Sequence, residues 1–62
     1  MRYRVGSVIR YRTIADRMRT VVVTKKQRNV KNGRPGFEGR ETTGTGNMVW
    51  GYDEGITQVI KY

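Results

Sequence analysis

Apolar residues along this chain fall in short bursts between polar or glycine-rich segments, which is the spacing expected of several short strands. The first burst, residues 7–12, alternates, so that Ile9 and Tyr11 point to one face of a strand and the arginines to the other. The second, residues 19–27, contains an unbroken β-branched run that favours a strand over a helix. The pattern therefore predicts two strands in the first half of the chain.

The rest of the chain predicts three more strands and the turns that join them. The predicted strands cover residues 37–41, 48–52 and 56–62. The stretch 28–35 contains Asn32-Gly33, a pair suited to positive φ, and predicts a turn. Further turns are expected at residues 42–46 and 53–55. Residues 13–18 are too short a run for a stable helix and predict a loop or a single turn.

Five short strands in 62 residues predict a single all-β domain over residues 1–62. A chain of this length buries a modest share of its surface, and the absence of Cys and His removes disulfides and the usual zinc sites as sources of stability. Closing the sheet into a small five-stranded barrel would protect its edge strands. The predicted centre of that barrel is Trp50, with four smaller apolar neighbours: Ile9, Val23, Met48 and Ile60.

The order of these segments is similar to that of the SH3-like barrel family. A long first loop, a β-branched central strand, a basic middle loop, a glycine-rich turn and a tight turn before the last strand follow one another. The resemblance is architectural and implies an SH3-like fold without a particular activity. Residues 5–10 and 49–53 also resemble small uncharacterised proteins of actinobacterial phages and their hosts, which implies no known activity either.

Charge is distributed unevenly along the chain. Thirteen Lys and Arg stand against five Asp and Glu, for a formal net charge of +8. Eleven of the basic residues but only one acid, Asp16, lie within residues 1–34. A field of one sign draws a protein toward polyanions and costs stability through self-repulsion. Arg outnumbers Lys nine to four, which favours bidentate and stacking contacts.

The residue types present argue against an enzyme. Nucleophilic catalysis by Ser or Cys needs a base that is usually His, and the chain has neither His nor Cys. The five carboxylates fall in or beside predicted turns, where solvated carboxylates are common. The glycine-rich segments 33–39 and 44–46 lack the Gly-Lys-Ser/Thr ending of a phosphate-binding loop. We therefore expect no catalytic residue, no metal and no cofactor.

The expected location of the protein is the cytoplasm. No apolar run approaches the length of a membrane span. The basic N-terminus is followed by Gly6 and Ser7 rather than by an apolar stretch, so a signal peptide is not expected. If the protein binds DNA, it would be associated with the nucleoid.

The basic surface is the strongest chemical signal in the sequence. Arg and Lys neutralise phosphates and release counterions, which gives binding without sequence readout. We expect the outward-facing residues of the first two strands and the middle loop to bind nucleic acid. The predicted members of this face are Arg10, Arg12, Arg19, Lys25, Arg28, Lys31 and Arg34. The predicted function is non-enzymatic, sequence-tolerant binding of duplex DNA, which is favoured because the aromatic residues are needed in the core.

Several alternatives stay open at this point. Trp50 and Tyr52 lie on one face of a predicted strand, and with Phe37 they would form a stacking platform for single strands if they were exposed. The four tyrosines suit the core and such a platform about equally, because Tyr tolerates a half-buried position. The basic face would also fit a protein-interaction module that docks on an acidic surface of a partner protein, an RNA-binding protein, or a solvated surface without a partner.

Overall fold

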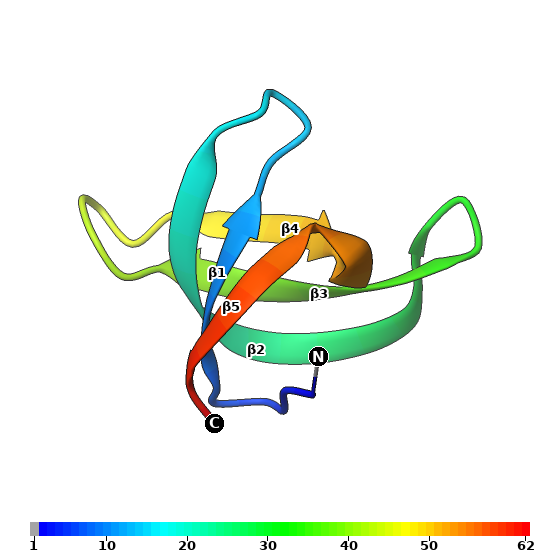
Figure 1. The fold of residues 1–62 in the computed structure, drawn as a ribbon, viewed down its shortest axis with the longest axis horizontal. Coiled ribbons are helices and arrows are strands. Elements are labelled where there is room, and N and C mark those ends of the chain that lie inside the picture. Colours follow the sequence, from blue (N-terminus) through cyan, green and yellow to red (C-terminus); the bar gives the residue numbers. More distant parts are fainter. Residues whose placement is uncertain (1) are drawn as a thin grey trace.

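Residues 2–62 are described by a computed structural model, in which five antiparallel strands form one sheet (Figure 1). The elements are β1 (Val8–Arg12), β2 (Met18–Lys31), β3 (Arg34–Glu41), β4 (Met48–Tyr52), a 3₁₀ turn η1 (Asp53–Gly55) and β5 (Ile56–Lys61). The predicted all-β fold with five strands is confirmed. Residue 1, the first position of the predicted domain, lies outside the described residues. Within the described part of the chain, no helix is long and apolar enough to cross a membrane.

The sheet curves strongly, most visibly along β2, but it does not close (Figure 1). Its strand order is β4-β3-β2-β1-β5, so β4 and β5 are the two edges and do not pair with each other. The predicted closed barrel is therefore wrong. The turn η1 carries the chain from β4 at one edge to β5 at the other, where β5 pairs with β1. Closure would require β4 and β5 to pair with each other as well. The edges have only five and six residues, which limits them as templates for foreign strands.

The β2–β3 hairpin is longer than predicted. Lys31 pairs with Arg34 across a two-residue turn formed by Asn32 (φ 57°) and Gly33 (φ 74°). A two-residue turn with both φ values positive matches the twist of the flanking strands, so both strands extend up to it. The turn predicted within residues 28–35 is present, but it is only two residues long. The other residues of that stretch belong to β2 and β3.

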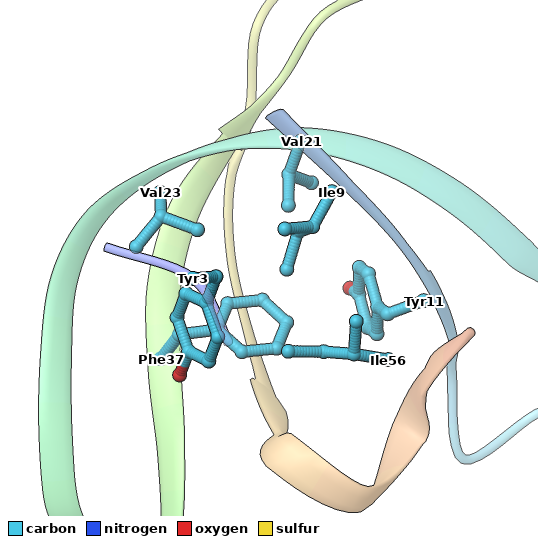
Figure 2. Packing of buried hydrophobic residues seen from close by; sticks show 7 residues of the cluster. All are labelled: Tyr3, Ile9, Tyr11, Val21, Val23, Phe37 and Ile56. Atoms are coloured by element: carbon cyan, nitrogen blue, oxygen red, sulfur yellow. The ribbon is translucent and has the colours of Figure 1, made fainter. Parts of the chain in front are cut away.

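The core lies on the concave face of the sheet and is centred on Phe37 (Figure 2). Phe37 is fully buried, and the rings of Tyr3 and Tyr11 meet it edge-on at centroid distances of 6.0 and 5.1 Å. Edge-to-face pairs of this kind add to the stabilisation that burial provides. The other buried apolar residues are Ile9, Val21, Val23 and Ile56, against which Val49 and Val59 pack half-buried.

Trp50 lies outside this core, and its predicted central position is wrong: 39% of its surface is exposed. The cause is Gly51, which pairs with Phe37 and faces the core. A Cβ on Gly51 would come within 2.9 Å of the rings of Phe37 and Tyr11, so those rings occupy the space that a side chain would need. With Gly51 inward, strand alternation turns Trp50 and Tyr52 outward.

The other predicted core residues divide in the same way. Ile9 and Val23 are buried as predicted, whereas Met48 is 54% and Ile60 50% exposed. Met48 shares the outward face of β4 with Trp50. In β5, two register shifts against β1 break the alternation, so that Val59 rather than Ile60 pairs with the buried Ile9.

Tyr3 makes the stability of the fold sensitive to alkaline pH. Its hydroxyl donates to the Asp53 carboxylate and lies 3.3 Å from the Gly36 carbonyl oxygen. Burial, reinforced by the hydrogen bond to Asp53 and by the charge of that carboxylate, raises the Tyr3 pKa far above its ordinary value. Burial also raises the pKa of Tyr11.

The expected result is a loss of stability above about pH 10, the ordinary pKa of Tyr. There the unfolded chain releases protons that the folded chain still holds, so the free energy of unfolding should fall by up to about 1.4 kcal/mol per pH unit for each tyrosine involved. Below that pH the contribution is constant. Thermal unfolding of the wild type and of Tyr3→Phe across this range measures the effect. An equally steep decline in both proteins would contradict the role of Tyr3.

Candidate functional site

The surface of the sheet opposite the core gathers basic side chains from four strands. Arg40 of β3 pairs with Val22 of β2. Val22 pairs with Val8 of β1, and Val8 pairs with Lys61 of β5. Residues that pair across an antiparallel ladder project from the same face of the sheet, so this row runs across four strands on one face. We call this surface the convex face; its exposed basic residues are Arg10, Arg12, Lys25, Arg40 and Lys61.

Three of the predicted binding residues lie on the convex face: Arg10, Arg12 and Lys25. Alternation with the buried residues of β1 is sufficient to place the two arginines. Lys25 is different, because simple alternation from the buried Val23 would turn it to the concave side. A register shift between these two residues reverses the alternation, and Lys25 pairs with Glu38 on the convex face.

Sequence reasoning missed Arg40 and Lys61. Arg40 lies three residues after Phe37, so alternation along β3 would have turned it outward once Phe37 was known to be buried. Lys61 lies five residues after the buried Ile56, so simple alternation along β5 also turns it outward. The two register shifts between β1 and β5 cancel over that length and leave it on this side.

Two of the predicted residues lie elsewhere. Arg19 pairs with the buried Tyr11, so it projects from the concave side at the margin of the core. Its predicted grouping with Arg10 is wrong, because the register pairs Arg10 with Thr20. Arg28 is exposed on β2, three residues beyond Lys25.

The last two predicted residues, Lys31 and Arg34, lie against the outward aromatic residues of β4. The Lys31 ammonium is 5.5 Å from the centre of the Trp50 ring, and the Arg34 guanidinium is 3.9 Å from the centre of the Tyr52 ring. Both distances fall within the range of cation–π attraction. The two rings also meet edge to face, with a centroid distance of 5.4 Å. The tip of the β2–β3 hairpin therefore holds its cations over the exposed Trp50 and the half-buried Tyr52.

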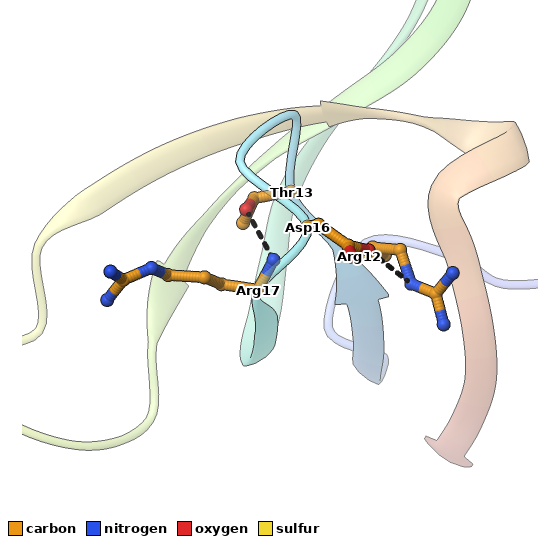
Figure 3. Close-up of polar contacts among 4 residues, drawn as sticks. All are labelled: Arg12, Thr13, Asp16 and Arg17. Carbon is orange, nitrogen blue, oxygen red and sulfur yellow. Dashed lines mark hydrogen bonds and ion pairs between the residues drawn. The ribbon is translucent and has the colours of Figure 1, made fainter.

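The loop between β1 and β2 is held by local bonds at its base (Figure 3). The backbone N–H of Arg17 donates to the Thr13 hydroxyl at 3.2 Å, and the Thr13 N–H donates to the Arg17 carbonyl oxygen at 2.7 Å. Asp16 has a φ of 61° and forms an ion pair with Arg12 at 3.3 Å. As predicted, residues 13–17 form a loop rather than a helix.

A groove of about 470 Å³ lies between this loop and β4. That volume is within the range of sites that hold small organic groups. Apolar and aromatic walls are supplied by Tyr11, Ile14, Ala15, Trp50 and Tyr52, and charged groups by Arg12, Arg34 and Glu54. Ile14 is 83% exposed, so the loop presents an apolar side chain that nothing in the described chain covers.

Three carboxylates in and near this region are engaged with neighbouring side chains. Glu54 forms an ion pair with Arg34, and Asp16 does so with Arg12. Glu38 accepts a hydrogen bond from the Gln27 side-chain amide at 2.5 Å. Within residues 2–62, Lys31 forms no ion pair with a carboxylate side chain. The same is true of four convex-face cations: Arg10, Lys25, Arg40 and Lys61. These cations are therefore available to an anionic partner.

The chemistry on this surface is that of anion and aromatic contacts. Strand-borne cations can contact phosphates, and exposed rings can stack on planar groups. No cluster of three or more His, Cys, Asp or Glu side chains that could hold a metal ion occurs within positions 2–62. A scan against protein-family models finds no match, and searches of curated proteins and of solved structures find none either.

Proposed function

We propose that this protein binds nucleic acid without catalysis, through contacts between the convex face and backbone phosphates. The observation that carries the proposal is the gathering of five exposed basic residues on one face of the sheet. Glu38 is the single carboxylate that the register of the described strands places among them. A formal net charge of +8 adds a long-range attraction for polyanions.

The spacing of these cations suits a phosphate backbone. Arg40 and Lys61 are separated by three strand-to-strand steps, which is roughly 14 Å at the usual spacing of neighbouring strands. A nucleic-acid strand advances about 3.4 Å per phosphate, so a face of this width can contact about four phosphates. Such contacts carry no sequence information, and the proposed binding is therefore tolerant of sequence.

The order of the segments along the chain resembles that of SH3-like barrels, but a fold of that kind hosts many functions and does not name a partner. A nucleic-acid partner would place the protein with the nucleic acid of the cytoplasm. The sequence-based preference for duplex DNA rested on the aromatic residues being needed in the core. Phe37, Tyr3 and Tyr11 are buried there, but Trp50 is exposed and is free to contact a partner.

A salt titration tests the proposal. Fluorescence anisotropy with labelled oligonucleotides should show association at low salt, with log affinity falling linearly against log salt concentration. For about four phosphate contacts the slope should be roughly −3 to −4, since each contact contributes about −0.9 for duplex and −0.7 for single strands. The absence of association with duplex and single-stranded probes at about 20 mM salt would disprove the proposed function.

A further inference from the structure

The outward side of β4 carries an exposed Trp50 and a half-buried Tyr52, both outside the core. Trp50 is the only tryptophan of the chain, and it is 39% exposed, while the core is filled by Phe37 and two tyrosine rings. Tyr52 lies beside it, two residues along an edge strand that has no neighbour on its other side. Exposed aromatic groups that gather in one place, rimmed by polar residues, mark binding surfaces more often than isolated exposed residues do.

We infer that Trp50, supported at its edge by Tyr52, forms a stacking platform for the bases of a single-stranded nucleic acid, whose phosphates bind Lys31 and the convex face. This inference rests on the proposed function and names its substrate class. Base stacking on aromatic rings beside a basic surface is how proteins hold single strands without reading their sequence.

The arrangement of cations around the rings fits this substrate. Lys31 lies 5.5 Å from the centre of the Trp50 ring, a looser contact than the 3.9 Å between Arg34 and Tyr52. Arg34 is also held by Glu54, so it fixes Tyr52, whereas Lys31 has no carboxylate partner among the described residues. A base can therefore replace the Lys31 ammonium over the indole, and the ammonium can then contact the adjoining phosphate.

Space for bases is present on two sides of Trp50. The groove of about 470 Å³ lies toward the β1–β2 loop. A second hollow of about 260 Å³ is lined by Trp50, Lys31, Val30, Gln27 and Glu38. Its amide and carboxylate can exchange hydrogen bonds with base edges, which in a single strand are free.

A duplex does not use these features. Its bases are stacked on one another, so Trp50 would meet only the sugar–phosphate backbone, and only the cations would contribute. An acidic protein surface would likewise use the cations and leave the hollows beside the indole without planar groups. The aromatic pair thus favours a single strand over either alternative.

The test compares three anionic probes at the same salt concentration: oligo(dT) of about 12 nucleotides, a duplex of the same length, and poly-glutamate. Trp50 is the only tryptophan, so stacking of a base on it should quench the intrinsic fluorescence of the protein. We expect quenching with oligo(dT) alone and an affinity for oligo(dT) about tenfold or more above that for the duplex.

Two variants make the test specific. Trp50→Ala should lower the affinity for oligo(dT) by about tenfold or more and leave duplex affinity unchanged, while Trp50→Phe, which keeps a ring, should retain most of it. Circular dichroism and thermal unfolding should show that both variants fold, as expected for a side chain outside the core.

Equal affinity for oligo(dT) and duplex, without quenching, would overturn the inference and leave the proposed function standing. Equally tight, Trp50-dependent binding of poly-glutamate would overturn it in favour of an acidic protein partner. No binding of any nucleic acid would overturn both.

Discussion

Replacing Arg10, Arg40 and Lys61 together with Glu should abolish nucleic-acid binding at moderate salt while the protein stays folded. The three side chains are exposed, and they come from three different strands that the register brings to one face. For each phosphate that the variant no longer neutralises, the slope of log affinity against log salt should become shallower by about one, and the introduced carboxylates repel the backbone. We expect affinity to fall by about 100-fold or more, measured by anisotropy at about 100 mM salt.

A matched variant separates the geometry of the face from the total charge. Replacing Arg2, Arg17 and Arg19 with Glu makes the same change in formal net charge, from +8 to +2. These residues are also exposed, and none belongs to the convex face. This control should weaken binding only severalfold, through the weaker long-range field. If both triple variants bound equally weakly, binding would follow net charge and the convex face would have no special role.

Replacing Phe37 with Ala should destabilise the protein more than any other single substitution described above. Phe37 is fully buried, and its ring contacts those of Tyr3 and Tyr11 from two sides. Truncation of a buried Phe costs about 3–5 kcal/mol, because transfer energy is lost and a cavity remains. A chain of 62 residues has a total stability of roughly 3–9 kcal/mol, so this one change removes about a third of it or more. Thermal denaturation followed by circular dichroism should show Tm falling by tens of degrees.

Two comparisons make this result specific to the core. Phe37→Leu keeps most of the apolar volume and should cost only about 1–2 kcal/mol. Trp50→Ala removes a larger side chain from the surface and should cost only about 1 kcal/mol, since Trp50 is outside the core. If Trp50→Ala destabilised the protein as strongly as Phe37→Ala, the division into core and platform would be incorrect.

Much of the local structure could be predicted from the sequence. The predicted strand 48–52 has the same bounds as β4, and alternation on β1 placed Ile9 and Tyr11 inside and Arg10 and Arg12 outside. These predictions held because they depend on neighbouring residues along a single strand. The Asn32-Gly33 turn was located for the same reason, since its φ values are a property of the two residues themselves.

The candidate site was less accessible, because its residues are grouped by strand pairing. A register shift after Val23 decides that Lys25 shares a face with Arg10, and a shift along β5 decides that Val59 rather than Ile60 pairs with the buried Ile9. A shift of one residue moves a side chain to the other side of the sheet, and alternation within one strand cannot reveal it. Arg19 was misplaced for a different reason. It alternates with Val21 and Val23, so a buried Val23 already implied the concave side, in agreement with the pairing of Arg19 with Tyr11.

The position of Trp50 separates the two levels most directly. The strands, the turn chemistry, the excess of positive charge and the aromatic character of β4 all follow from the order of residues along the chain. Which side of β4 faces the core does not, because Phe37 and Tyr11 on other strands already fill the space that Gly51 leaves open. In a core this small there is room for one arrangement of large rings, and the ring that does not fit is left on the surface.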